Sequence, residues 1–82
     1  MNKKVPSYYI GKNKQIKAHE IISDYELTYN IGTAVTYLLR AGKKPNNPAK
    51  QDIQKAIDHL QFELDTLENN QYIINENANS TY

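Results

Sequence analysis

Apolar residues recur at helical spacing in three successive stretches of the chain. In the second stretch they follow the i, i+3, i+4, i+7 rule: Ile31, Ala34, Val35, Leu38 and Ala41. That spacing places all five side chains on one face of a helix, and we expect this face to be buried. The sequence therefore predicts an all-α fold, a small three-helix domain with helices near residues 16–25, 29–41 and 48–68 and no substantial sheet.

The third stretch has the longest apolar stripe, in steps of one, three and four residues: Ala49, Ile53, Ala56, Ile57, Leu60, Leu64 and Leu67. It opens on a strong start signal, with Asn47 at the N-cap and Pro48 at the first helical position. The stripe is longer than the first two helices need for packing. Two interpretations stay open: it completes a core within one chain, or it joins copies into a homo-oligomeric helical bundle.

Polar segments frame the helices. Residues 1–15 hold lysines around Pro6, which biases the chain away from helix, and we expect an extended N-terminal arm there. Residues 16–69 then form the helical domain. Residues 70–82 are rich in asparagine, and we expect a polar C-terminal tail that does not fold by itself.

Two glycines carry local predictions. Gly42 directly follows the second stretch and is expected to end that helix, as glycine does after a helix C-terminus. Gly32 lies inside the same helix, where glycine costs about 1 kcal/mol relative to alanine. Its presence predicts close approach by another backbone or by a ligand.

Composition limits the classes of function. The chain has 82 residues, which suits one domain with a small core and favours self-association. It has no cysteine, so it offers no thiolate site, and the isolated His19 and His59 do not make a zinc site. The formal net charge of +1 argues against generic duplex DNA binding. We expect neither a metal nor a cofactor.

The chain also lacks membrane and export signals. No apolar run reaches the ~20 residues that span a bilayer, and the first residues lack the apolar segment of a signal peptide. We therefore expect no membrane partner and a cytoplasmic location.

The polar side of the second helix offers candidate chemistry. Thr33, Tyr37 and Arg40 are spaced by three and four residues, so they are expected to point together at one object. The planar guanidinium of Arg40 suits phosphate recognition, and Tyr37 offers a ring for a base. Lys43 and Lys44 follow at once, and they are equally well explained as cations that favour a helix C-terminus.

Other side chains extend this candidate site. Tyr8 and Tyr9 either pack over the helices or stack on a planar ligand, and Lys12 brings positive charge nearby. Asp52 and Lys55 sit three apart on the third helix, as an ion pair or as part of the site. The full candidate ligand-binding set is Tyr8, Tyr9, Lys12, Asn30, Thr33, Tyr37, Arg40, Lys43, Lys44, Asp52 and Lys55.

Four segments resemble a known family. They are residues 9–11, 29–32, 37–44 and 52–56, with sequences Tyr-Ile-Gly, Tyr-Asn-Ile-Gly, Tyr-Leu-Leu-Arg-Ala-Gly-Lys-Lys and Asp-Ile-Gln-Lys-Ala. Together they resemble a family of short bacteriophage proteins of formerly unknown function, whose module also occurs in the nucleotide kinase of some short-tailed coliphages. The resemblance covers about two-thirds of the chain. It implies an affinity for nucleotides in an infected host cell.

The chain departs from that family at three positions. Members usually have His-Tyr where this chain has Tyr8-Tyr9, Asn at the position of Thr33 and Lys at the position of Thr36. There is also no Gly-x-x-x-x-Gly-Lys-Ser/Thr loop to hold a triphosphate. Kinase activity therefore does not follow from the motifs.

Three functions remain as hypotheses. The first is a non-enzymatic phage binder, a sponge for a nucleotide-derived immune signal such as a cyclic ADP-ribose or a cyclic oligonucleotide, which counters host defence. The second is an enzyme related to nucleotide kinases that acts on nucleoside monophosphates, with His19 or His59 as acid or base and Asp52 as a metal ligand or orienting group. The third is an inhibitor that binds a host enzyme through the third helix and the tyrosine-rich ends.

Overall fold

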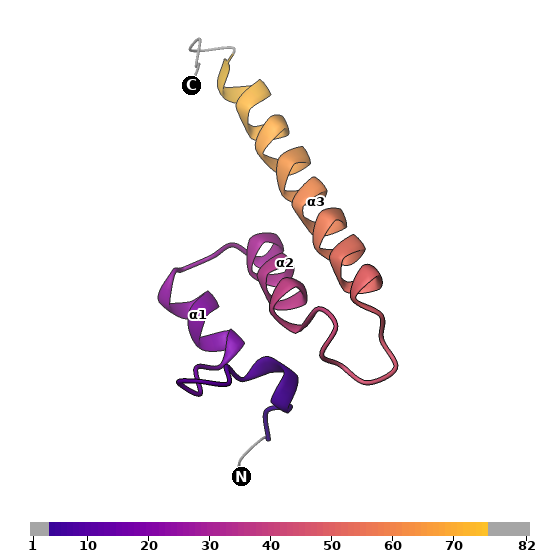
Figure 1. Cartoon of the computed structure of the whole chain (residues 1–82). Helices are drawn as coiled ribbons and strands as arrows, with labels where there is room; N and C mark the ends of the chain where they lie inside the picture. Colours follow the sequence, from indigo (N-terminus) through magenta and orange to yellow (C-terminus); the bar gives the residue numbers. More distant parts are fainter. Residues whose placement is uncertain (1–3, 76–82) are drawn as a thin grey trace.

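The computed structural model describes residues 4–75 and contains a 3-10 turn and three helices in that range. The turn η1 spans Ser7–Tyr9, and helix α1 spans Ala18–Asp24. Helix α2 spans Tyr29–Arg40, and helix α3 spans Ala49–Asn75. Within residues 4–75 the only β-type pairing is one isolated bridge between Ile10 and Lys17. The predicted all-α fold with three helices is therefore confirmed (Figure 1).

Helices α2 and α3 form an antiparallel hairpin. At one end Thr28 donates to Glu63 Oε1 at 3.0 Å, and at the other Arg40 binds Asp52. Thr28 also caps α2, because its Oγ1 accepts the backbone N–H of Ile31 at 3.2 Å. Gly42 follows α2 with φ at +80°, a conformation that glycine adopts without strain, as the sequence predicted.

Helix α1 packs on another side of α2. A Cβ built at Gly32 would lie 2.8 Å from Cγ2 of Ile22, closer than the non-bonded contacts that Cβ atoms make in proteins. The predicted close approach at Gly32 is therefore present, and the approaching group is an isoleucine side chain of α1. Figure 1 shows α2 between α1 and α3.

The N-terminal segment differs from the extended arm that the sequence predicted. After η1 the chain closes a tight loop, in which Gly11 N–H donates to the Ile16 carbonyl at 2.7 Å and Gln15 N–H donates to the Gly11 carbonyl at 3.1 Å. These backbone hydrogen bonds fold the segment back on itself and direct it into α1. The folded segment, residues 7–17, is called the N-terminal loop below.

Helix α3 is longer than predicted. Residues 70–75, where the sequence predicts the start of the polar tail, continue the helix, while residues 76–82 lie outside the described part. No glycine or proline lies between Ala49 and Asn75 to end it. Figure 1 shows its second half extending well past α2. None of the helices in residues 4–75 is both long and apolar enough to pass through a membrane.

The core is smaller and more polar than the apolar pattern predicted. The buried side chains are the small residues Ala18, Ala34 and Ala56 together with Arg40 and Asp52. Leu38, predicted to be buried, is 49% exposed, and only Ala56 of the long α3 stripe is buried. The reason is that α3 crosses α2 along alanines and the Arg40–Asp52 pair, which turns the larger aliphatic side chains outward.

Candidate functional site

Arg40 and Asp52 form a buried ion pair where the last turn of α2 meets the first turn of α3. Arg40 donates to Asp52 Oδ1 through Nη2 at 2.9 Å and through Nε at 3.1 Å. The arginine is 6% exposed and the aspartate is fully buried. Asp52 was predicted as a ligand-binding residue, and here its carboxylate faces a side chain of the same molecule.

The pair shifts the titration of both groups. The hydrogen bonds from Arg40 lower the pKa of Asp52, against the opposing effect of burial and with smaller help from the Asn47 side chain. The same bonds raise the pKa of Arg40. Asp52 Oδ2 and Asn47 Nδ2 are both buried without a partner at ordinary hydrogen-bond geometry. Asp52 is therefore held charged by Arg40 first and by Asn47 only weakly.

Three tyrosines surround the Arg40 guanidinium. Nη1 donates to the hydroxyl of Tyr9 at 2.9 Å. The guanidinium carbon lies 5.0 Å from the Tyr37 ring centre and 5.9 Å from those of Tyr8 and Tyr9, within the range of cation–π attraction. Arg40 thus connects the N-terminal loop to the α2–α3 hairpin.

A cavity of about 830 Å³ lies between the N-terminal loop, α1 and the C-terminal end of α2. Its walls are mostly aliphatic and aromatic, with two lysines: the principal lining residues are Tyr8, Tyr9, Ile10, Lys12, Ile16, Ile21, Leu39 and Lys43. This volume falls within the range of small-molecule sites in proteins. Four of the predicted site residues, the two tyrosines and the two lysines, come together here.

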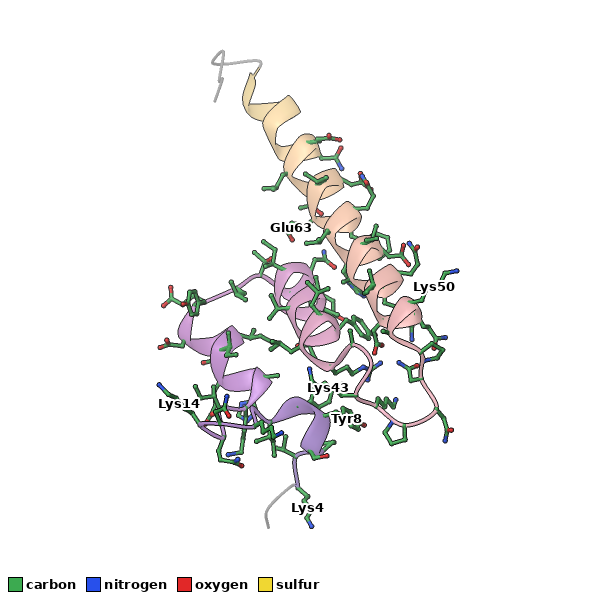
Figure 2. The ribbon with its side chains drawn as sticks, in the orientation of Figure 1. Lys4, Tyr8, Lys14, Lys43, Lys50 and Glu63 are labelled. Carbon is green, nitrogen blue, oxygen red and sulfur yellow. The ribbon has the colours of Figure 1, made fainter. Side chains whose placement is uncertain are left out.

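The lysines differ in how they are held. Lys43 Nζ donates to the Leu39 carbonyl at 2.9 Å, which keeps its charge at the cavity next to Tyr8 (Figure 2). Lys44 Nζ lies 5.9 Å from the Tyr8 ring centre. Lys12 is exposed and enters the cavity wall from the loop. Lys12 and Lys43 thus bring two positively charged side chains to the cavity wall.

A second group of predicted residues lies along the α2–α3 contact. Asn30 Oδ1 is 2.9 Å from His59 Nδ1, and the His59 ring lies among the rings of Tyr29, Tyr37 and Phe62 at 5.4–6.0 Å. Lys55 Nζ is 5.5 Å from the Tyr37 ring centre. His59 is isolated in the sequence, because Phe62 is the one of these three rings that lies near it along the chain.

The expected common surface of Thr33, Tyr37 and Arg40 does not form. Tyr37 and Arg40 do lie together, but the Arg40 guanidinium is turned inward toward Asp52. Thr33 lines a separate hollow of about 220 Å³ beside Ile22 and Gly32. Helical spacing predicted that the three side chains share one side of α2. It could not show that Asp52 of α3 would bind the Arg40 guanidinium.

The aliphatic half of the cavity wall was not predicted from the sequence. Ile10, Ile16 and Leu39 belong to no common periodic pattern, and the backbone bonds between Gly11 and Ile16 bring the first two together. Within residues 4–75 no cluster of histidine and acidic side chains is arranged to hold a metal ion.

Comparison with protein-family models, curated proteins and solved structures finds no match to this chain. The resemblance to the phage family therefore rests on the four segments alone, and membership stays a prediction.

Proposed function

We propose that this protein binds a nucleotide-derived small molecule without converting it. The observation that carries the proposal is the cavity beside the N-terminal loop, which combines aromatic and aliphatic walls with Lys12 and Lys43. A nucleotide needs a flat apolar surface for its base and positive charge for its phosphates. The Tyr8 ring supplies the flat surface, the isoleucines add apolar contacts beside it, and Lys12 and Lys43 supply the positive charge.

In this proposal Arg40 acts from behind the cavity wall. Its hydrogen bond to the Tyr9 hydroxyl fixes one tyrosine of the wall, and Asp52 fixes Arg40 in turn. A site whose wall is held in place before binding loses less entropy when the ligand arrives. Arg40 thus supports binding through the position of Tyr9.

The positions of the histidines favour binding over catalysis. His59 lies within the α2–α3 aromatic group, and His19 lies on the exposed side of α1. Neither contributes to the cavity lining. A general acid or base must reach the reacting group within hydrogen-bond distance, directly or through one water.

The resemblance to the phage family extends the proposal to a biological role. A binder of this kind, made in the cytoplasm of an infected cell, would act as a sponge for a cyclic ADP-ribose or a cyclic oligonucleotide and so counter host defence. We further propose that it works as a homo-oligomer. Both statements are supported by the sequence pattern and the resemblance.

Calorimetry with mononucleotides, dinucleotides and cyclic nucleotides tests the proposal. Lys12→Glu and Lys43→Glu should each weaken binding by about tenfold to a hundredfold, the scale of a lost hydrogen bond to a charged group. Lys4→Glu is the matched control, since Lys4 is an exposed lysine outside the cavity lining (Figure 2). Its affinity should stay close to that of the parent protein.

Mass spectrometry of the small molecules released by denaturation separates a binder from an enzyme. A nucleotide recovered unchanged after long incubation supports binding alone, and a converted one identifies turnover. If no nucleotide binds, or if all three lysine variants lose affinity equally, the cavity is not a nucleotide site.

A further inference from the structure

Helix α3 presents two different faces along its length. The face toward α2 carries small or polar residues spaced by three and four: Ala49, Asp52, Ala56, His59 and Glu63. Asp52, His59 and Glu63 each contact α2 or its cap. The aliphatic residues lie one position further along the helix, which is a rotation of about 100°. They therefore form a separate face beside the one that α2 covers.

This second face is a heptad seam that the rest of residues 4–75 covers only in part. Its residues are spaced by four, three, four and three: Ile53, Ile57, Leu60, Leu64 and Leu67. Each is between 42% and 52% exposed. Uninterrupted spacing of this kind is typical of helices that pair along their length. Below, these five residues are called the α3 seam.

Helix α2 borders the seam with Leu38. The antiparallel register that joins Arg40 to Asp52 places Leu38 level with Ile53. Helical geometry turns Leu38 to the same side of the hairpin as the seam, away from the side that carries Tyr37 and Lys55. An aliphatic surface thus covers one side of the α2–α3 hairpin, and it is distinct from the nucleotide cavity.

We propose that the α3 seam binds the α3 seam of a second copy of this chain in antiparallel orientation. Ile53, Leu60 and Leu67 are spaced by seven, so these three are symmetric about Leu60. With Leu60 opposite Leu60 of the second copy, Ile53 meets Leu67, and Ile57 lies one residue, about 1.5 Å, out of register with Leu64. Two α2–α3 hairpins joined in this way form a four-helix arrangement.

Charge selects the antiparallel orientation. Lys50 and Glu68 are exposed and lie at opposite ends of the flank of the seam that faces away from α2. Antiparallel pairing brings Lys50 of each copy beside Glu68 of the other. Parallel pairing would instead set Lys50 of each copy beside Lys50 of the other. Opposite charges attract and like charges repel, so the antiparallel dimer is favoured.

The same pairing accounts for the second half of α3. This part extends past α2 and has no neighbouring helix among the described residues (Figure 1). An isolated helix of this length is marginal in water. In the dimer it lies along the first half of α3 of the second copy, next to Leu38 of that copy's α2.

Measurement of the mass in solution tests the dimer with two matched variants. Leu64→Asp should raise the dimer dissociation constant by more than about a hundredfold, because each dimer would bury two charges in an apolar seam. Thr66→Asp places the same charge two residues away on the opposite side of α3 and should leave the dimer intact. Circular dichroism checks that both variants keep their helices.

A single cysteine tests the orientation, since the chain has none of its own. In the antiparallel dimer Gln61 lies next to Gln61 of the second copy, whereas Gln54 lies near Glu68. Gln61→Cys should therefore form a disulfide-linked dimer on mild oxidation, and Gln54→Cys should not. Both glutamines are exposed on the same flank, so they are equally accessible to oxidant.

Three results would overturn the proposal: a monomeric parent protein at tens of micromolar, equal dissociation by the two aspartate variants, or equal crosslinking by the two cysteine variants. A monomeric parent that captures a different protein, with capture lost in Leu64→Asp, would be a different outcome. It would assign the α3 seam to a heterologous partner instead of a second copy. Nucleotide affinity is measured separately, so failure of the dimer leaves the cavity proposal standing.

Discussion

At the level of single residues, the Arg40–Asp52 pair joins three parts of the chain. Arg40 comes from α2, Asp52 from α3, and Tyr9 from the N-terminal loop. A buried ion pair is not in itself a strong source of stability, because both charges lose hydration. Removing one member is costly, however, because the other charge is left buried without compensation.

Asp52→Asn should therefore destabilise the fold. We expect the melting temperature to fall on the order of 10 °C, since Arg40 becomes an uncompensated buried cation in a chain of this size. Asp58→Asn is the matched control, because Asp58 is an exposed carboxylate on the same helix that bonds only Gln54 within the described residues. A comparable fall in melting temperature in both variants would contradict a special role for the Arg40–Asp52 pair.

The same pair predicts a dependence on pH. Arg40 lowers the folded-state pKa of Asp52 below its ordinary value of 3.8. The contribution of Asp52 is thus complete above pH 3.8 and is lost as the pH falls through the lower folded-state pKa. In thermal melts from pH 6 to pH 2, the melting temperature of the parent should fall more steeply with acid than that of Asp52→Asn. Parallel curves would show that Asp52 does not carry this acid sensitivity.

At the level of elements, the contact between α1 and α2 depends on the missing side chain at Gly32. In an open helix, Gly→Ala is stabilising by about 1 kcal/mol. Here the added methyl would overlap Ile22 Cγ2 at 2.8 Å, and overpacking of this kind costs about 1–3 kcal/mol. The steric cost is the larger effect.

Gly32→Ala should lower the free energy of unfolding by about 1 kcal/mol, measured in urea. The Ile22→Ala background supplies the control, because it removes the atom that clashes. There the same glycine substitution should be neutral or stabilising, as helix propensity alone predicts. An equal loss in both backgrounds would mean that Gly32 is needed for another reason.

At the level of the whole molecule, the elongated shape suits the proposed dimer. The chain extends 47 Å along its longest axis and 27 and 24 Å along the others, which reflects the length of α3. A protein that buries mainly alanines and one ion pair has little intramolecular core. Pairing through the α3 seam would bury the aliphatic side chains that the single chain leaves half exposed.

Stability should then depend on protein concentration. A dimer gains stability by mass action, so each tenfold dilution should lower the melting temperature by about 3–5 °C. Leu64→Asp should melt at a lower temperature that does not change with concentration. A concentration-independent melting temperature in the parent would contradict assembly through the seam.

Much of the local structure could be predicted because its causes are local. Helical spacing located the three helices, and Gly42 was expected to end the second one. Each of these depends on residues within about four positions along the chain. The predicted end of α3 was too early, because asparagine-rich composition predicts a tail, whereas no glycine or proline interrupts the helix before Asn75.

The sequence by itself thus determined the helices, the glycine contact in α2 and which residue types are available for a site. Only the tertiary structure decided that Arg40 turns inward to Asp52, that Tyr9 joins them and that the aliphatic faces stay exposed. Arg40 and Asp52 are 12 residues apart, and Arg40 and Tyr9 are 31 apart. Their pairing depends on how the connecting loops orient whole helices, which helical spacing within each segment does not specify.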